Sequence, residues 1–337
     1  MLVGGGYQLL ILLAIFMGSA LLSTLLVRIG MNIALSSGFV AHSNAVLHDK
    51  RRIAMGGGIA FGIVILASTL LLYKWNYLPQ RVPIALILTL AVGFIDDIRV
   101  LSPLKKLISL AAISCLYLLQ TDINPLLFPV TLLIMLASQN AWNLVDVMDG
   151  LAGWISVVSF FGIAVIILLS PYHLPGILIC SLVCAGAVLG FLPWNSPRAR
   201  VFMGDTGSLT LGTLFGILII EALGKDMTFA SCLVVTGFIP FFETAFLITE
   251  RTLKNLPIYL GSPDHFAIRL QDAGYSKAKI LRTVIASGIG LIIFSSLIFI
   301  NHAHLLFLVA IISVGCLVVI RVFRFLHCLP SHGEMRE

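Results

Sequence analysis

Long apolar runs recur along the whole chain and constrain its fold more than any other feature. Several have the length, about 20 residues, that an α-helix needs to cross a hydrocarbon layer about 30 Å thick. Of the 337 residues, 59% are hydrophobic and only 11% are charged, whereas a soluble domain carries roughly 25% charged residues. We therefore predict an all-α, polytopic membrane protein that forms a single integral-membrane domain over residues 1–337.

The apolar runs predict roughly ten or eleven transmembrane helices. Their approximate bounds are 8–29, 56–73, 82–95, 103–120, 126–142, 151–169, 175–192, 207–224, 228–249, 281–301 and 303–325. The third run is short, and the fifth to the eighth contain Gly, Ser or Asn, which leaves a count of ten open. The cysteines lie within or beside these runs without a CxxC pair, as is typical of small core residues.

Lysine and arginine gather on alternate loops. If the N-terminus lies outside, all of the 21 lysines and arginines except Lys74, Arg81 and Lys225 lie on the cytoplasmic side. Cytoplasmic loops of membrane proteins carry an excess of these residues, so we predict an outer N-terminus and a cytoplasmic C-terminus. The net charge of +6 then reflects topology and attraction to anionic lipid headgroups. No basic stripe with interleaved aromatic residues points to nucleic acid.

Most aspartates fall on the same predicted cytoplasmic side. They are Asp49, Asp96, Asp97, Asp146, Asp149, Asp205, Asp264 and Asp272. A transporter or channel more often carries its ionisable groups at mid-membrane depth, along a path. Glu221 and Glu243 lie within predicted spans, and they keep a non-catalytic transporter or lipid-binding protein as an alternative.

The first acidic stretch, GFIDDIRVLSPLKKL, follows the third run and holds Asp96 and Asp97 side by side. On a helix, adjacent side chains point about 100° apart, so we do not expect these two carboxylates to share one role. The simpler alternative is a helix-capping aspartate with a solvated neighbour.

The second acidic stretch, NAWNLVDVMDGLAG, repeats a polar residue every three positions at Asn143, Asp146 and Asp149. If this segment is helical, the spacing gathers the three side chains on one face. The alternative makes Asp149 the N-cap of the following span, but that explanation leaves Asn143 and Asp146 without a role.

The third acidic stretch, PWNSPRARVFMGDTGSLTLG, places Asp205 just before an apolar run. This pattern is typical of an N-cap, yet a helix N-terminus also offers free N–H groups to a phosphate, with Arg198 and Arg200 close in sequence. Four or more carboxylates with several cations on one membrane face together indicate a site for a divalent cation and a pyrophosphate. Mg²⁺ is the expected metal, because it binds one or two carboxylates together with phosphate oxygens and water.

These stretches resemble the signature loops of a known family. GFIDD at 93–97, NAWNLVDVMDGLAG at 140–153 and FMGDTGSLTLG at 202–212 resemble, in order, three loops of the polyprenyl-phosphate N-acetylhexosamine-1-phosphate transferases. HDKRRIAMGGGIAFG at 48–62 is similar to the family's first cytoplasmic loop, and SPDHFAIRLQDAGYS at 262–276 to its last. The resemblance spans most of the chain.

The resemblance implies an activity and a setting. The activity is transfer of a sugar-1-phosphate, expected to be an N-acetylhexosamine-1-phosphate, from a UDP-sugar to a polyprenyl phosphate, with release of UMP. The polyprenyl-diphosphate sugar so formed would initiate a cell-envelope glycan. The implied cofactor is Mg²⁺, with Mn²⁺ as an alternative. The implied setting is a bacterial-type plasma membrane with the active site on its cytoplasmic face, in a monomer or a homodimer.

The resemblance also implies roles for individual residues. Asp205 is the leading Mg²⁺ ligand, joined by Asp97, and Asp96 with Asp97 serves the lipid phosphate or the metal. Asp96, Asp97 and Asp205 are thus the expected catalytic residues. The expected substrate-binding residues are Asn143, Asp146 and Asp149 on the nucleotide side, Phe202 against uracil, and Lys50, Arg51, Arg52, His265 and Arg269.

Three departures from the family pattern bear on sugar identity and nucleotide affinity. Val147 stands where the family's DGxDG motif has a glycine, and its branched Cβ restricts close approach. Arg52-Ile53-Ala54-Met55 replaces the usual Pro-Thr-Pro-Arg run. The last loop holds only His265 in place of two or three histidines, with Arg269 four residues on.

A CDP-alcohol phosphatidyltransferase is a further alternative, because such enzymes also use aspartates at the membrane edge. Their motif begins with Asp-Gly but continues DGxxAR, followed by GxxxD and another aspartate. Asp149-Gly150-Leu151-Ala152-Gly153 lacks the arginine and the later acids, which disfavours this class.

Overall fold

The computed structural model describes residues 5–41, 52–257, 264–300, 322 and 324–328. This part of the chain is helical apart from one small hairpin, in which β1 (Val40–Ala41) pairs antiparallel with β2 (Ile53–Ala54). The prediction of an all-α protein is therefore confirmed. The predicted run 303–325 lies almost wholly outside the described residues, and so do both chain ends.

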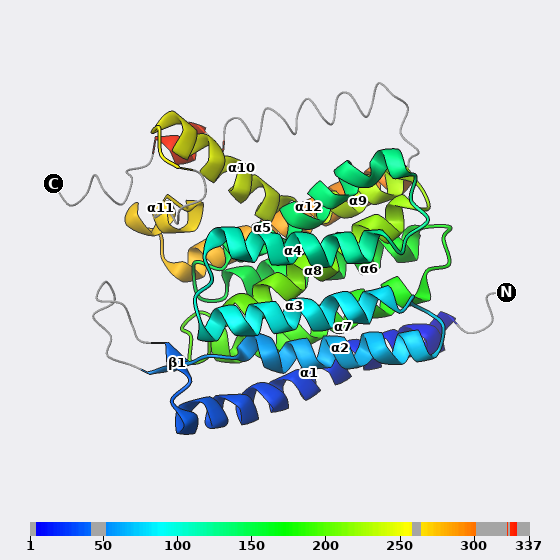
Figure 1. The fold of residues 1–337 in the computed structure, drawn as a ribbon, viewed down its shortest axis with the longest axis horizontal. Helices are drawn as coiled ribbons and strands as arrows, with labels where there is room; N and C mark the ends of the chain where they lie inside the picture. Colours follow the sequence, from blue (N-terminus) through cyan, green and yellow to red (C-terminus); the bar gives the residue numbers. More distant parts are fainter. Residues whose placement is uncertain (1–4, 42–51, 258–263, 301–321, 323, 329–337) are drawn as a thin grey trace.

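Twelve α-helices and one 3₁₀-helix are named within the described residues. They are α1 (Gly5–Ser37), α2 (Gly57–Lys74), α3 (Arg81–Ile98), α4 (Pro103–Leu118), η1 (Pro125–Leu127), α5 (Phe128–Val145), α6 (Leu151–Leu169), α7 (Pro175–Asn195), α8 (Gly204–Leu223), α9 (Met227–Thr236), α10 (Phe238–Leu253), α11 (Phe266–Asp272) and α12 (Lys277–Ile300). Most of them lie side by side, with their long axes roughly aligned (Figure 1).

Seven described helices are long and apolar enough to cross a membrane: α1, α2, α5 with η1, α6, α7, α8 and α12. Helices α9 and α10 together would make an eighth span. The chain is thus a polytopic membrane protein. Helix α3 has the length of a span but carries Arg81 at one end and Asp96 and Asp97 at the other, and α4 is shorter, with 16 residues. Both lie within the bundle beside the longer helices (Figure 1).

Helix α8 is the centre of the bundle. Of its most apolar stretch, 89% is buried within the protein, and it packs against α2, α3, α5 and α9. By contrast, only 17% of the corresponding stretch of α1 is buried. Because other helices enclose its side chains, α8 is held in place, and residues at its N-terminus are held in place relative to the neighbouring helices.

The predicted span 228–249 is broken, which the apolar pattern did not anticipate. Helices α9 and α10 meet at an angle of 74°. A β-carbon at Gly237, between the two helices, would lie 2.2 Å from the Phe215 ring, so only glycine fits there. Pro240 lies in the first turn of α10, where its missing N–H is tolerated. The break directs α10 away from the axis of the bundle (Figure 1).

Candidate functional site

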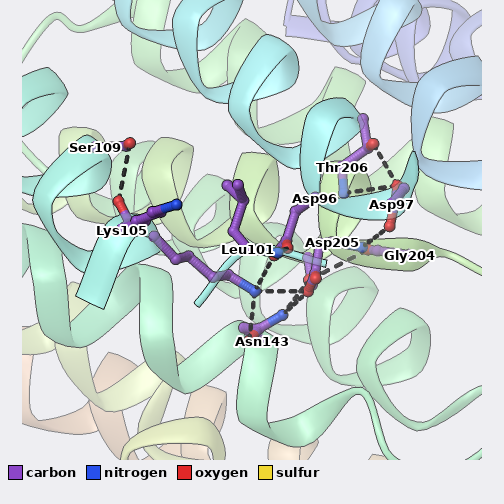
Figure 2. Close-up of polar contacts among 11 residues, drawn as sticks. Asp96, Asp97, Leu101, Lys105, Ser109, Asn143, Gly204, Asp205 and Thr206 are labelled. Carbon is purple, nitrogen blue, oxygen red and sulfur yellow. Dashed lines mark hydrogen bonds and ion pairs between the residues drawn. The ribbon is translucent and has the colours of Figure 1, made fainter. Parts of the chain in front are cut away.

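The N-terminus of α8 is capped by an aspartate from another helix. The Asp97 carboxylate, at the end of α3, accepts hydrogen bonds from the backbone N–H groups of Asp205 at 2.7 Å and Thr206 at 3.1 Å. The Thr206 hydroxyl donates to the same carboxylate at 2.5 Å. Figure 2 shows Asp97 facing this first turn. The capping interpretation of Asp205 is therefore wrong, because Asp205 lies inside the helix and Asp97 binds the free N–H groups.

Glycines in the sequence motifs allow α2, α3 and α8 to meet at this point. A β-carbon on Gly58 would lie 2.2 Å from the backbone nitrogen of Gly207, and one on Gly93 would lie 2.5 Å from Thr206 Cα. Such distances are too short for any side chain. The two glycines therefore bring the backbones of α2 and α3 directly against the first turn of α8, which fixes the direction in which Asp205 points.

Lys106, near the start of α4, joins three of the predicted site residues. Its Nζ lies 2.9 Å from Asp96 Oδ2, 2.9 Å from Asp205 Oδ1 and 3.3 Å from Asn143 Oδ1. Asn143 Nδ2 in turn donates to Asp205 Oδ1 and, at 3.1 Å, to Ser208 Oγ. Residues from α3, α5 and α8 thus converge around one ammonium group carried by α4. Figure 2 shows Asp96, Asn143 and Asp205 lying close together.

The sequence alone predicts Lys106 only as a charge on the cytoplasmic side and gives it no role in the site. A signal was nevertheless present. Ser102 caps α4 and Pro103 begins it, so the helix starts directly after the paired aspartates. The Leu101 N–H donates to Asp96 Oδ1 at 2.6 Å, which holds this turn closed and places Lys106 beside the end of α3.

Asp146 faces the cluster without a cation of its own. No hydrogen bond or ion pair holds its carboxylate within the described part of the chain. Burial, together with the nearby carboxylates of Asp205, Asp97 and Asp149, raises the pKa of Asp146 to about 7. Like charges this close disfavour ionisation. A bound cation would remove that cost.

Asp149 is not the N-cap of α6. The N-cap is Gly150, whose φ of 78° is in the left-handed region, and no side chain caps this end. The Asp149 carboxylate instead accepts a hydrogen bond from Lys277 Nζ at 2.7 Å. This ion pair ties the loop between α5 and α6 to the start of α12, so Asp149 does not lie with Asn143 on a shared helical face.

Asn195 links two of the motif loops, and sequence reasoning missed it. Its Oδ1 accepts from the Gly150 N–H at 2.8 Å, and its Nδ2 donates to the Val201 carbonyl at 2.9 Å. The asparagine is 4% exposed. It therefore fixes the distance between the loop that carries Asp146 and the loop that leads to Asp205. The one signal in the sequence was a polar residue at the end of an apolar run.

The first-loop residues and Phe202 lie at one edge of the site. Phe202 pairs through its backbone with Ala54 and Gly57, and its side chain is partly buried. Arg52 is exposed. Lys50 and Arg51 lie outside the described residues. Of the two arginines before Asp205, Arg200 stacks on Trp194, with 4.8 Å between the guanidinium and the ring.

His265 and Arg269 belong to a second cluster, at the junction of α10 and α11. His265 Nδ1 lies 2.8 Å from Glu243 Oε1. Arg269, 1% exposed, donates to Glu250 at 2.5 Å, to Asp264 at 3.1 Å and to the Leu326 carbonyl at 3.0 Å. Arg269 is predicted to bind substrate, but both of its terminal nitrogens already donate hydrogen bonds within the protein.

Val147 contributes to packing. It is partly buried against a hydrophobic cluster that includes Met148, Phe246 and Phe266. This packing explains the valine without reference to a nucleotide, and it joins the loop after α5 to α10 and α11.

The two intramembrane glutamates are both paired. Glu243 binds His265, as described above. Glu221 accepts hydrogen bonds from Arg81 at 2.9 Å and from the Tyr117 hydroxyl at 2.8 Å, at the opposite ends of α3 and α8 from the aspartates. Both glutamates are therefore explained by partners inside the protein.

The carboxylates fit a hard cation only in part. Among the described residues no group of three or more His, Cys, Asp or Glu is arranged to hold a metal. Mg²⁺, however, needs only one or two carboxylates when phosphate oxygens and water complete its shell. Asp205 and the unpaired Asp146 meet that requirement, whereas Asp97 is occupied by the N-terminus of α8.

Known proteins share the segment of the chain that carries these aspartate stretches. Residues 80–223, which carry all three aspartate stretches, match the family described as Glycosyl transferase family 4. A protein named probable undecaprenyl-phosphate N-acetylglucosaminyl 1-phosphate transferase, from Bacillus subtilis (strain 168), is 32% identical over 286 residues, which cover 77% of each chain.

Phospho-N-acetylmuramoyl-pentapeptide-transferases match over shorter stretches. The protein of that name from Prochlorococcus marinus (strain MIT 9312) is 30% identical over 54% of this chain and 52% of its own length. That from Microcystis aeruginosa (strain NIES-843 / IAM M-2473) is 38% identical over 46% of this chain and 50% of its own length. The aspartate stretches come together at the N-terminus of α8, and the Bacillus subtilis relative is 32% identical over 77% of each chain. The chain therefore belongs to glycosyl transferase family 4.

Proposed function

We propose that this protein transfers an N-acetylhexosamine-1-phosphate from a UDP-sugar to a polyprenyl phosphate and releases UMP. The observation that carries the proposal is the cluster in which Lys106 joins Asp96, Asp205 and Asn143 beside the capped N-terminus of α8. The name of the Bacillus subtilis relative supports both the acceptor and the transferred group, because it describes an undecaprenyl-phosphate N-acetylglucosaminyl 1-phosphate transferase.

The reaction exchanges one phosphorus–oxygen bond for another. An oxygen of the lipid phosphate attacks the sugar-bearing phosphorus of the UDP-sugar. The bond from that phosphorus to the bridging oxygen breaks, and the bridging oxygen leaves with UMP. Negative charge spreads over the non-bridging oxygens in the transition state, so fixed positive groups are the main means of catalysis.

Lys106 supplies such a group. Asp96, Asp205 and Asn143 hold its ammonium in one place, and only 17% of its side chain is exposed. A phosphate oxygen that replaces one of these three partners would receive a charge-assisted hydrogen bond. Because the lysine is already fixed, little reorganisation is needed as charge develops.

Asp205 and Asp146 would hold Mg²⁺ in this proposal, with phosphate oxygens as the remaining ligands. When bound, the ion would supply positive charge that stabilises the negative charge developing on phosphate oxygens. Asp97 then serves as a positioning residue, since its carboxylate fixes the turn that carries Asp205. Asp96 orients Lys106. Mn²⁺ would occupy the same ligands.

The proposed setting is the plasma membrane of a bacterium, with the cluster on the cytoplasmic face where UDP-sugars are made. The product, a polyprenyl-diphosphate sugar, would begin a cell-envelope glycan. The excess of lysine and arginine on the loops at this end supports that orientation.

Purified protein in detergent, mixed with radiolabelled UDP-N-acetylglucosamine, undecaprenyl phosphate and Mg²⁺, tests the function. We expect label in the butanol-extractable lipid and release of UMP, both lost on chelation with EDTA. Uptake of the donor into vesicles without formation of a labelled lipid would contradict the proposal and favour transport.

A further inference from the structure

Four polar side chains form a hydrogen-bonded layer inside the bundle. Thr89 on α3, Ser114 on α4, Gln139 on α5 and Thr213 on α8 have no exposed surface. Gln139 Nε2 donates to Thr213 Oγ1 at 3.1 Å, and the hydroxyl oxygens of Thr213 and Thr89 lie 3.2 Å apart. Ser114 Oγ lies 3.5 Å from Gln139 Oε1. We refer to these four residues as the polar layer.

The hydroxyl protons give the polar layer a direction. Thr89 uses its proton in a 2.9 Å hydrogen bond to the Ala85 carbonyl, so Thr213 is the donor in the bond between the two threonines. Thr213 accepts in turn from Gln139. The chain therefore runs from Gln139 through Thr213 and Thr89 to a backbone carbonyl, and both threonine hydroxyl protons are used. Buried polar groups in a membrane protein need such internal partners.

The polar layer uses the same four helices as the candidate site. Thr89 precedes Asp96 on α3 by about two helical turns, and Thr213 follows Asp205 on α8 by about two turns. Two further pairs complete the correspondence: Ser114 with Lys106 on α4, about two turns apart, and Gln139 with Asn143 on α5, about one turn apart. Helices α3, α5 and α8, which contribute to the Lys106 cluster, are therefore linked by hydrogen bonds one to two turns away from it. Ser114 on α4 donates to the Leu110 carbonyl at 2.8 Å and adds only the longer contact to Gln139.

The backbones of α5 and α8 also touch at this level. A β-carbon on Gly212 would lie 2.5 Å from the Ser138 carbonyl oxygen and 2.7 Å from Gln139 Cα. With no side chain between them, the two helix backbones are in direct contact, and the distance between the helix axes cannot shrink further. The directional hydrogen bonds of Gln139 and Thr213 then set how far one helix is displaced along the other.

We propose that the polar layer sets the axial register of α3, α4, α5 and α8, and that Gln139 and Thr213 are positioning residues for the phosphoryl transfer. This inference rests on the proposed function. Apolar packing alone permits small sliding between smooth helices, whereas a directional bond does not. Interhelical hydrogen bonds in membranes add little stability, but a displacement of about 1 Å at a reacting group costs about a hundredfold in rate.

The substitution Thr213→Val tests the proposal, because valine keeps the shape of threonine and removes both hydrogen bonds. We expect kcat to fall by about tenfold or more, with the KM for UDP-N-acetylglucosamine within about twofold, as for interactions that act only in the transition state. Thr213→Ser keeps the hydroxyl and should retain most of the rate. The matched control is Ser159→Ala, which removes a buried 2.8 Å bond from α6 to the Thr236 carbonyl and leaves the four helices untouched.

A double-mutant cycle separates register from general destabilisation. Thr89→Val removes the same bond from the other side, so Thr89→Val and Thr213→Val should be non-additive in kcat, whereas Ser159→Ala and Thr213→Val should be additive. Thr89→Val also serves alone if Thr213→Val does not fold.

The register proposal would be overturned if both valine variants kept the wild-type kcat, or if Thr213→Ser lost as much kcat as Thr213→Val. The proposed function would stand in either case. A wild-type protein that forms no labelled lipid would overturn both.

Discussion

Two charged clusters lie at the same end of the bundle, and they differ in how completely their charges are compensated. In the first, one lysine is shared among Asp96, Asp205 and Asn143, and the Asp146 carboxylate has no partner among the described residues. In the second, each terminal nitrogen of Arg269 is bound, and Glu250 also accepts from His327. The first cluster has an excess of negative charge that a bound cation would compensate. The second is closed on itself.

The difference shows why charge on a loop is a poor guide to its function. Both clusters follow from similar sequence features, an aspartate near a membrane edge with basic residues close by. A buried ion network in which each carboxylate has a cationic partner holds elements together, here α10, α11 and the segment around Leu326. An incompletely paired cluster favours binding of a cation, because the cation relieves the repulsion that remains between its carboxylates after folding.

The largest expected effect is on the first cluster. Asp205→Asn should insert and purify normally yet lose at least about a hundredfold in transfer rate, on the order of 2.7 kcal/mol, because a neutral amide binds Mg²⁺ far less well than a carboxylate. The radiolabelled transfer assay measures it. Asp226→Asn is the control, since Asp226 caps α9 at the Phe229 N–H and Asn caps as well as Asp. Near-normal transfer by Asp205→Asn would remove Asp205 from the metal site.

The second cluster should respond in stability and not in rate. Arg269→Met removes the buried guanidinium that Glu250 and Asp264 share, and it leaves them with His327 and Lys254 as partners. Removing one member of a buried ion pair costs up to about 3–5 kcal/mol. We expect a large drop in Tm, while the kcat of the protein that remains folded stays within a few fold of wild type. Arg282→Gln, an exposed arginine on α12, should change neither quantity. If Arg269→Met kept its Tm and lost its rate, the arginine would belong to the active site.

The two clusters should also have opposite dependences on pH. The folded pKa of Asp146, about 7, exceeds the unfolded value of about 3.9, so the folded state binds the proton more tightly. Stability therefore falls as pH rises from about 4 to 7. Without divalent cations, Asp146→Asn should raise Tm clearly at pH 8 and by much less at pH 5.

Asp264 provides the contrast. Burial opposes its ionisation, but Lys254 and Arg269 lower its pKa below the ordinary value. The ionised Asp264 carboxylate therefore stabilises the folded state above about pH 4, and this stabilisation is lost only as the pH falls further. Asp264→Asn should lower Tm at both pH 5 and pH 8. Parallel pH profiles for the two asparagine variants would show that the clusters do not differ in compensation.

The smallest perturbation tests whether both clusters face the same side of the membrane. Cysteines placed at the exposed positions Val100, beside the first cluster, and Ser276, beside the second, should resist an impermeant thiol reagent added outside intact cells. A cysteine at Leu126, at the other end of the bundle and 84% exposed, should be labelled. The background lacks the six native cysteines. Labelling at position 100 would place the cluster outside the cell.

Much of the site could be predicted from the sequence, but the roles within it could not. Asp96, Asp205 and Asn143 do come together, as the three aspartate stretches indicated. Lys106 and Asn195 were missed, because each acts through a partner more than 30 residues away in the chain. The capping assignments failed for a related reason. A helix N-terminus needs an acceptor, but the acceptor can come from any segment that packs there, and Asp97 reaches α8 from α3.

The sequence by itself determined that the chain is a helical membrane protein and that its acidic motifs belong on loops or helix ends at one end of the bundle. Those features follow from composition and hydrophobic length, which act locally along the chain. Only the tertiary structure decided that Asp97 caps α8, that Lys106 joins three helices and that Arg269 is closed within its own cluster. The physical reason is that partner choice depends on which backbones can approach, and glycines such as Gly58 and Gly93 permit that approach only in the folded bundle.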